Sequence, residues 1–329
     1  MQVTPSLTIA VPTYNRKRWL SLTLPEIIEQ AREVPPGDIE VVVSDNCSSD
    51  GTWEYLQELA SKVCFLKIHR NETNIGAEAN FYLLPTLASG RYLHMIGDDD
   101  LLISGALSRI RSALRDEPDY VVINFDLYNS TLDKCARKNQ LNAFQDQVFD
   151  GPEDCLSRVD AMTAGFISMW VAKREFFNVI PEEKFHYFAK WGMSIQSDRY
   201  FGISRFPKGR LVAESCLRTR QNTDLRDDVF FSWFMTGSAE VFSYTASVGV
   251  LSNSVILTLK RRLLLKNALQ RVRYERRTGM FKSAETYRLL RADYGNFLEF
   301  WLLCVPTMFA PGLGFMINIL RRLLGRADS

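Results

Sequence analysis

In the stretch Tyr92-Leu93-His94-Met95-Ile96-Gly97-Asp98-Asp99-Asp100, three consecutive carboxylates directly follow an apolar, strand-like run. Adjacent like charges repel, so ionising all three costs free energy unless a cation or solvent compensates. A loop at the end of a buried strand is a usual ligand site in an α/β sheet. The stretch therefore indicates a site for a hard divalent cation, Mg²⁺ or Mn²⁺, that carries a phosphate. The alternative is a solvated acidic turn that caps the next helix.

Strand-like and helix-like segments alternate through the first 125 residues. Apolar or β-branched runs predict strands at 7–11, 39–44, 65–69, 92–96 and 120–125, and apolar residues at helical spacing predict helices at 18–31, 50–61, 76–88 and 105–115. This alternation predicts βαβ units and a mostly parallel sheet flanked by helices. Because such crossovers are right-handed, the carboxyl ends of the strands and their loops should share one rim.

The rest of the chain is less regular. Residues 126–165 are polar and predict a connecting lobe, and 166–171 followed by 173–175 predicts a strand that enters a helix. Residues 181–235 are rich in aromatic and charged side chains, as a binding lobe would be. We therefore divide the chain into a ligand-binding half (1–125), a second half of the same domain (126–250) and a helical tail (251–329).

Charge is distributed unevenly along the 329 residues. Residues 1–150 hold 14 Lys/Arg and 21 Asp/Glu, residues 151–250 hold 12 of each, and residues 251–329 hold 14 Lys/Arg and 5 Asp/Glu, which gives −7, 0 and +9. A basic tail favours an acidic partner or surface. Nucleic acid could supply such a surface, but the apolar stretch beside the basic residues favours lipid.

The tail combines a basic segment at 259–291 with an apolar segment at 297–320. A bilayer span needs about 20 apolar residues in unbroken helix, and Glu299, Pro306 and Pro311 interrupt this one. Helices that lie in the interface of an anionic membrane fit the pattern best. Packing on the globular part or on a second subunit, and a true span, remain alternatives.

Cysteine usage and the N-terminus bear on the compartment. The six cysteines show no CxxC pair, so neither a zinc site nor a disulfide framework is indicated, and reduced cytosolic thiols are expected. The first residues lack a basic region followed by an apolar one, and we therefore expect no signal peptide.

Four motifs fall at predicted strand ends, where the fold would bring them together. They are Val11-Pro12-Thr13-Tyr14-Asn15-Arg16, the segment from Ser44-Asp45-Asn46 to Thr52, Asn74-Ile75-Gly76-Ala77-Glu78-Ala79-Asn80, and Gly97-Asp98-Asp99-Asp100. Each alone is compatible with an ordinary turn or a helix cap. Their order and spacing together resemble the family 2 glycosyltransferases, clearly over residues 5–125 and loosely over 160–222.

The resemblance implies a GT-A-type, Rossmann-like fold and transfer of a sugar from a nucleotide donor (UDP-, dTDP-, CDP- or GDP-sugar). By that resemblance the 12–15 loop and Asp45–Asn46 hold the base and ribose, and Asn74 and Gly76 border the pocket. Asp99 and Asp100 are implied as ligands of Mn²⁺ or Mg²⁺, with Asp98 beside them at the donor. The family pattern has an aspartate where this chain has Gly97.

A metal suits this chemistry because the donor leaves as a nucleoside diphosphate with developing negative charge. The acceptor hydroxyl needs a base, and a carboxylate base typically contributes about 10²–10⁴-fold. The resemblance places that base at Asp198, with inverting stereochemistry; Glu182, Glu183 and Asp160 are the other candidates. Arg220 matches a later basic position near the diphosphate, and a solvent-facing role is the alternative.

The leading hypothesis is a peripheral or monotopic enzyme at the cytoplasmic face of the membrane, with a polyprenyl-linked glycan acceptor. It would act in bacterial surface polysaccharide synthesis, resembling the O-antigen and capsule transferases, among them those for deoxyhexoses. A catalytically silent nucleotide-binding scaffold is the second hypothesis. A nucleotidyltransferase is disfavoured because the first strand is not followed by a Gly-rich phosphate loop. Oligomerisation stays open.

Overall fold

The computed structural model describes residues 4–159, 163–190, 193–220, 227–265 and 283–309, together with 269 and 272. The chain divides into two compact units. The first comprises Met1–Arg158, Ala164–Ala189 and Ser194–Asp224, and the second comprises Val159–Thr163, Lys190–Met193 and Leu225–Ser329. The predicted tail, 251–329, lies within the second unit.

The N-terminal part of the first unit follows the predicted alternation. Strands β1 (Leu7–Thr13), β2 (Ile39–Asp45), β3 (Leu66–Arg70) and β4 (Tyr92–Met95) are joined by helices α1 (Lys17–Arg32), α2 (Thr52–Ala60) and α3 (Ala77–Leu87). The strands pair in parallel in the order β3-β2-β1-β4. Every residue of β1 and β2 is buried, as expected for parallel strands that are covered on both faces.

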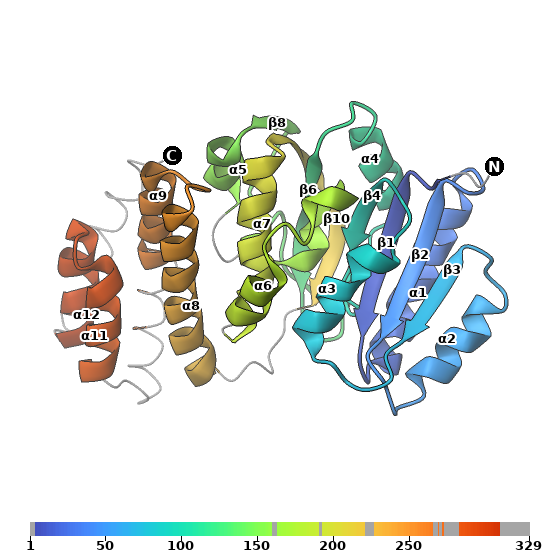
Figure 1. Cartoon of the computed structure of the whole chain (residues 1–329), viewed down its shortest axis with the longest axis horizontal. Helices are drawn as coiled ribbons and strands as arrows, with labels where there is room; N and C mark the ends of the chain where they lie inside the picture. Colours follow the sequence, from blue (N-terminus) through green and yellow to red (C-terminus); the bar gives the residue numbers. More distant parts are fainter. Residues whose placement is uncertain are drawn as a thin grey trace. The chain divides into compact units, whose positions relative to one another are not determined.

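The order of these strands determines where the helices lie. The chain moves outward from β1 to β2 to β3 and then returns to place β4 on the other side of β1. Because the crossovers are right-handed, this reversal puts α3 on the opposite face of the sheet from α1, as Figure 1 shows. The reversal also separates the loops after β1 and β4, which leaves room for a ligand at the carboxyl ends of the strands.

The other strands of the first unit complete a mixed sheet in the order β3-β2-β1-β4-β9-β6-β10-β5. These are β5 (Leu101–Leu102), β6 (Tyr120–Tyr128), β9 (Trp170–Lys173) and β10 (Lys208–Arg220), with β7 (Cys135–Arg137) on β6 and β8 (Gln147–Asp150) on β10. Strand β10 runs parallel to β6, whereas β9 is antiparallel to both β4 and β6. The predicted class, an α/β fold with a mostly parallel sheet flanked by helices, is confirmed.

Helices of the first unit cover this second part of the sheet. They are α4 (Ala106–Ala113), α5 (Pro152–Arg158), α6 (Glu182–Ala189) and α7 (Ser194–Arg205), with short 3₁₀ turns at Thr163–Gly165, Ile167–Met169 and Arg174–Phe176. Two predictions differ from the structure here. Residues 167–169 form a 3₁₀ turn, and the predicted strand at 166–171 is a strand at Trp170 and Val171, the start of β9. A three-residue 3₁₀ turn, Arg174–Phe176, stands where a helix was expected at 173–175.

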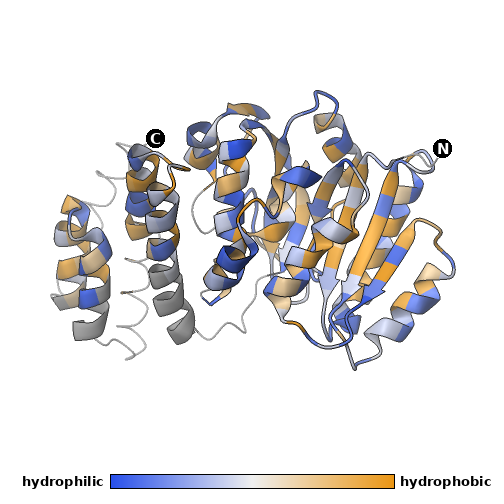
Figure 2. Ribbon diagram, in the orientation of Figure 1, coloured by the Kyte–Doolittle hydropathy of each residue, from blue (hydrophilic) through white to orange (hydrophobic). Residues whose placement is uncertain are grey.

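The core of the first unit lies on the faces of its sheet, where the strand residues are predominantly apolar (Figure 2). Where β6 and β9 meet, Tyr120, Trp170 and Phe176 form an aromatic cluster with ring centroids 5.4–6.0 Å apart. Gly209 packs against this cluster, since a Cβ there would stand 2.3 Å from the Tyr120 ring. Through Trp170, the cluster holds the start of β9, which directly follows the segment that reaches the aspartate turn.

The second unit is helical in its described part. It contains α8 (Asp227–Ser247), α9 (Asn253–Leu263), α11 (Ser283–Tyr294), a π-helical turn at Phe300–Cys304 and α12 (Val305–Phe309). Arg261 pairs with Glu299 at 2.6 Å, while Leu298 and Trp301 are 64% and 42% exposed. Among the described residues no helix combines the length and apolarity that crossing a membrane requires. Residues 310–329 and all basic residues of 266–282 lie outside the described residues.

Candidate active site

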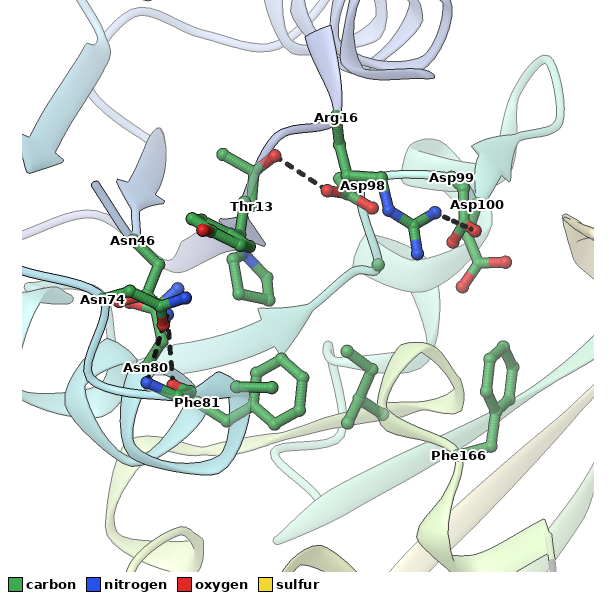
Figure 3. A pocket seen from close by; sticks show the side chains of 16 residues that line it. Thr13, Arg16, Asn46, Asn74, Asn80, Phe81, Asp98, Asp99, Asp100 and Phe166 are labelled. Carbon is green, nitrogen blue, oxygen red and sulfur yellow. Dashed lines mark hydrogen bonds and ion pairs between the residues drawn. The ribbon is translucent and has the colours of Figure 1, made fainter. Parts of the chain in front are cut away.

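A cavity of about 540 Å³ opens where the loops after β1, β2 and β4 converge. Asparagines lie on one side of it and the three aspartates on the other (Figure 3). Residues from five segments line the cavity: Pro12, Thr13, Tyr14 and Arg16; Asn46; Asn74, Gly76, Ala77, Asn80 and Phe81; Gly97, Asp98, Asp99 and Asp100; Phe166 and Ile167. The motifs predicted at separate strand ends therefore share one site.

The asparagine side of the cavity is a closed network of amides. Asn46 Nδ2 donates to Asn74 Oδ1 at 2.8 Å and to Gly76 O at 3.2 Å, while its Oδ1 accepts from Asn71 and the Ile75 amide. Asn80 is bonded in the same way to Ser44 and Asn71. Gly76 has a φ of +86°, a backbone conformation that favours glycine. The network thus fixes the wall of the cavity, and most donors and acceptors of these asparagine side chains are used within it.

Each of the three aspartates has its own hydrogen-bond partners. Asp98 accepts from Thr13 Oγ1 at 2.7 Å, which ties the turn to the end of β1. Asp100 accepts from Ser168 Oγ at 2.5 Å, and the same hydroxyl accepts from the Gly97 amide at 2.9 Å. Asp99 faces the cavity with its side chain 25% exposed, whereas Asp98 and Asp100 are 9% and 3% exposed. Figure 3 shows the contacts with Thr13 and Arg16.

Two arginines neutralise the exposed aspartate. Arg220 approaches Asp99 Oδ2 through Nε at 3.0 Å and Nη2 at 2.7 Å, and Arg16 Nη1 reaches the same oxygen at 3.1 Å. Among the described residues no group donates to the other oxygen, Asp99 Oδ1. The electrostatic environment of the turn is therefore a balance between three carboxylates and two guanidinium groups.

Burial dominates the protonation of the other two aspartates. It raises the pKa of Asp98 to about 7, against the hydrogen bond from Thr13 and with the charge of Asp99 acting in the same direction as burial. Burial and the charge of Asp99 likewise raise the pKa of Asp100 to about 7. A dication bound nearby would favour the carboxylate form of both groups and so lower their pKa values.

The geometry of the turn also explains why a glycine stands at position 97, where the family pattern has an aspartate. A Cβ at this position would lie 3.0 Å from Asp100 Oδ2 and 3.5 Å from Asp99 Oδ1. Both oxygens therefore lie close to Gly97 on the same side of the turn. This pair of carboxylate oxygens suits Mg²⁺ or Mn²⁺, which take few protein ligands together with substrate phosphates. In the described part of the chain no cluster of three or more His, Cys, Asp or Glu side chains is placed to hold a metal by itself.

The structure brings together most of the predicted site residues. Nine line the cavity, namely Pro12, Thr13, Tyr14, Asn46, Asn74, Gly76, Asp98, Asp99 and Asp100. Asn15 and Asp45 lie just behind it: Asn15 Oδ1 accepts from the Ser49 amide, and the buried Asp45 accepts from the Ser48 amide and faces Arg70 Nε at 3.5 Å. Contacts of these two residues with a base or ribose stay predictions.

Asp198 does not line the cavity. It is 2% exposed on α7, where its oxygens accept from the amides of Asn178 at 3.0 Å and Val179 at 2.8 Å, and from Arg199 at 3.0 Å. Burial raises the pKa of Asp198, against the charge of Arg199 and these amides. The arrangement supports a role in fixing the 178–180 segment, and its role as a base stays a prediction.

The other candidate bases are no better placed. Glu182 and Glu183 lie in the first turn of α6 and do not line the cavity, and Asp160 lies outside the described residues. Sequence reasoning assigned no role to Arg16, Ser168, Asn80 or Phe81. Arg16 directly follows the 12–15 loop and Asn80 lies one helical turn after Gly76, so their positions gave a signal. Ser168 gave none, because its contacts are non-local.

Comparison with known proteins identifies the family of this chain. The family model "Glycosyl transferase family 2" matches residues 8–192, more than half of the chain. The chain belongs to this family. Its matched region contains β1–β4, the aspartate turn and Ser168. The cavity is therefore built almost wholly from the family's domain.

Relatives of this family 2 chain include bacterial glycosyltransferases. It is 36% identical over 114 residues to the abequosyltransferase RfbV of Salmonella typhimurium, which is 34% of each chain. It is 35% identical over 107 residues to the GalNAc(5)-diNAcBac-PP-undecaprenol beta-1,3-glucosyltransferase of Campylobacter jejuni, 32% of this chain and 33% of that one. The matched segments thus span about a third of each relative.

A solved structure supports the GT-A-type fold over nearly the whole chain. The mannosyltransferase PcManGT from Pyrobaculum calidifontis, in complex with GDP-Man and Mn²⁺, aligns with a TM-score of 0.54. The alignment covers 98% of this chain and 84% of that one at 16% identity.

Proposed function

We propose that this chain is a metal-dependent glycosyltransferase of bacterial surface polysaccharide synthesis. It would move a sugar from a nucleotide-sugar donor to a hydroxyl of a glycan acceptor. The observation that carries the proposal is Asp99, which faces a cavity lined by Tyr14 and Asn46 on one side and by Arg16 on the other. The names of the relatives, an abequosyltransferase and a glucosyltransferase, support a hexosyl or deoxyhexosyl substrate.

The two sides of the cavity suit the two parts of a nucleotide sugar. Tyr14, 43% exposed, and Phe81 offer aromatic surface for a base near the amide network. The aspartate turn and Arg16 offer oxygen ligands and positive charge for the diphosphate. GDP-Man and Mn²⁺ in PcManGT support a donor of this class and a divalent cation.

Asp99 and Asp100 would hold Mn²⁺ or Mg²⁺. When bound, the ion supplies positive charge that stabilises the departing diphosphate. The chain's own residues orient the turn: Thr13 holds Asp98, Ser168 holds Asp100, and Arg220 holds Asp99. We propose Asp198 as the base for inverting transfer. Because its contacts are buried, substitution of Asp198 is the direct test of this role.

We propose a lipid-linked acceptor and a membrane-associated tail. The relative from Campylobacter jejuni carries PP-undecaprenol in its name, which supports a polyprenyl-linked glycan. The exposed Leu298, Trp301 and Leu302 and the +9 charge of 251–329 support adsorption on an anionic, cytoplasmic membrane face. Binding of the tail to liposomes with and without anionic lipid tests this part separately.

Turnover assays test the function. Purified protein is incubated with radiolabelled UDP-, dTDP-, CDP- and GDP-sugars, Mn²⁺ and bacterial membranes as the source of acceptor. We expect transfer from one donor class, loss of transfer in EDTA, and at least a hundredfold loss in Asp99→Asn, about the effect of removing a key electrostatic contact. Absence of both transfer and donor hydrolysis with all four donors would sink the proposal.

A catalytically silent nucleotide-binding scaffold is the second candidate. The burial of Asp198 and its bonds to Asn178, Val179 and Arg199 favour it. Calorimetry with the four nucleoside diphosphates and Mn²⁺, set beside the turnover assay, separates the two functions. Binding without turnover identifies the scaffold.

A further inference from the structure

Two arginines that contact the same oxygen of Asp99 differ in how firmly they are held. The Arg220 side chain is 6% exposed, whereas that of Arg16 is 38% exposed. Arg220 makes two bonds to Asp99 Oδ2, and Arg16 makes one, which is also the longest of the three. A single oxygen has too few lone pairs for three good hydrogen bonds. The bond from Arg16 is therefore the one most easily given up.

Arg220 is fixed from its other side as well. Its guanidinium lies 4.6 Å from the centroid of the Trp19 ring on α1, an arrangement that holds a cation over an aromatic face. Neither Arg220 nor Trp19 lines the cavity. Held between the indole and Asp99, Arg220 acts on the site by orienting this carboxylate.

Arg16 has the opposite properties, because it precedes α1, lines the cavity and is open to water. We propose that Arg16 is the residue that binds the donor's diphosphate directly, and that Arg220 is a positioning residue for Asp99. Arg16 contacts Asp99 in the structure, and we expect its guanidinium to turn to the phosphate oxygens when a nucleoside diphosphate binds. The inference rests on the proposed function and specifies its donor site.

The negative charge of the diphosphate favours the movement of Arg16 from Asp99 to the phosphate oxygens. A diphosphate offers pairs of anionic oxygens that match the guanidinium fork, while Asp99 offers Arg16 a single shared oxygen. Release of Arg16 also leaves Asp99 with Arg220 alone, so that the carboxylate becomes a better ligand for a cation. Donor binding and metal binding are thereby linked through one side chain.

Calorimetry on the full chain tests this division of roles. UDP, dTDP, CDP and GDP are titrated into wild type with Mn²⁺, and the nucleotide that binds is then titrated into Arg16→Gln, Arg16→Lys, Arg220→Gln and Trp19→Leu. Arg32→Gln is the control, since it removes one charge from the far, exposed end of the same helix. Circular dichroism establishes that each variant is folded. Mn²⁺ is also titrated, at a nucleotide concentration set to each variant's own Kd.

We expect Arg16→Gln to bind the nucleoside diphosphate about 10- to 100-fold more weakly, the range of one charge-assisted hydrogen bond. Arg16→Lys should recover part of this loss and Arg32→Gln should match wild type. Arg220→Gln and Trp19→Leu should raise the Mn²⁺ concentration needed for half-maximal binding, and Arg16→Gln should not. Wild-type affinity in Arg16→Gln overturns the inference alone. A wild type that binds none of the four nucleotides overturns the proposed function as well.

Discussion

Acid stability can be predicted in detail from Glu40, a buried carboxylate on β2. Burial raises its pKa, but hydrogen bonds from Lys67, Ser89 and Thr8 outweigh burial and lower the pKa from 4.5 to about 2. Thr8 Oγ1 and the Ser89 amide each donate at 2.6 Å, and Ser89 Oγ donates at 2.7 Å. These partners come from β1, from β3 and from the turn before β4. Glu40 thus fastens together strands that end in the candidate site.

The contribution of Glu40 to the free energy of unfolding follows from the linkage between its protonation and folding. A pKa that falls from 4.5 to about 2 corresponds to about 3 kcal/mol at 1.36 kcal/mol per pKa unit. Lys67 is 58% exposed, so water screens its share, and we expect about 2 kcal/mol. Since the folded-state pKa is depressed, this stability is fully present above pH 4.5 and is lost as the pH falls toward 2.

Urea denaturation of wild type and Glu40→Gln, followed by circular dichroism, measures this effect. At pH 7 the variant should unfold with a free energy about 2 kcal/mol lower, and by pH 3 about half of that difference should be gone. Glu58→Gln is the matched control, because Glu58 pairs with Lys62 on an exposed face of α2 and should change little. A difference for Glu40→Gln that is the same at pH 3 and pH 7, or no larger than that of Glu58→Gln, would refute the reasoning.

Further predictions concern the site itself. Ser168→Ala should lower metal-dependent transfer by about tenfold through the loss of a hydrogen bond that positions Asp100, measured as kcat against Mn²⁺ concentration. Gly97→Ala should lower nucleotide affinity in calorimetry, because the new Cβ crowds Asp100 Oδ2. Asp198→Asn removes the charge that faces the buried Arg199, so the melting temperature should fall, and kcat per folded molecule should fall by about 10²-fold or more; an unchanged kcat per folded molecule would show that Asp198 is not the base. Gly76→Ala should destabilise the fold by about 1 kcal/mol in urea denaturation, because of the φ of +86°.

The N-terminal half of the fold could be predicted because its signals are local. The runs that became β1–β4 are apolar, and the helices between them have one apolar face, as in α1 with its buried Leu20, Leu24 and Ile28. The second half could not, because its strands depend on partners far along the chain. β10 pairs with β6 across about 90 residues, and a bulge between Val212 and Leu217 breaks its alternation. The strand predicted at 166–171 begins only at Trp170, because Ser168 in the preceding turn bonds to the aspartate turn.

The candidate site shows the same division between local and distant signals. Motifs at strand ends predicted the lining, because parallel strands bring their carboxyl ends to one edge of the sheet. No sequence pattern could reveal that Arg220 stacks on Trp19 while bonding Asp99, since the two contacts span 201 and 121 positions. For the same reason the resemblance could match Asp198 to a base but could not foresee its bonds to Asn178 and Val179.

The aspartate triplet shows why adjacent residues of one type need not share one role. Successive side chains in a tight turn leave the backbone in different directions, so Thr13 bonds to Asp98, Ser168 bonds to Asp100, and two arginines bond to Asp99, although all three aspartates line the cavity. Repulsion among the three is relieved by the raised pKa of Asp98 and Asp100, which favours their neutral forms, and by the charge of the two arginines. A cation would therefore meet Asp99 as the more exposed ligand and Asp100 as the more buried one, while Asp98 ties the turn to the end of β1. On this basis, substitution of Asp99 or Asp100 should weaken metal binding directly, and substitution of Asp98 should act through the geometry of the turn.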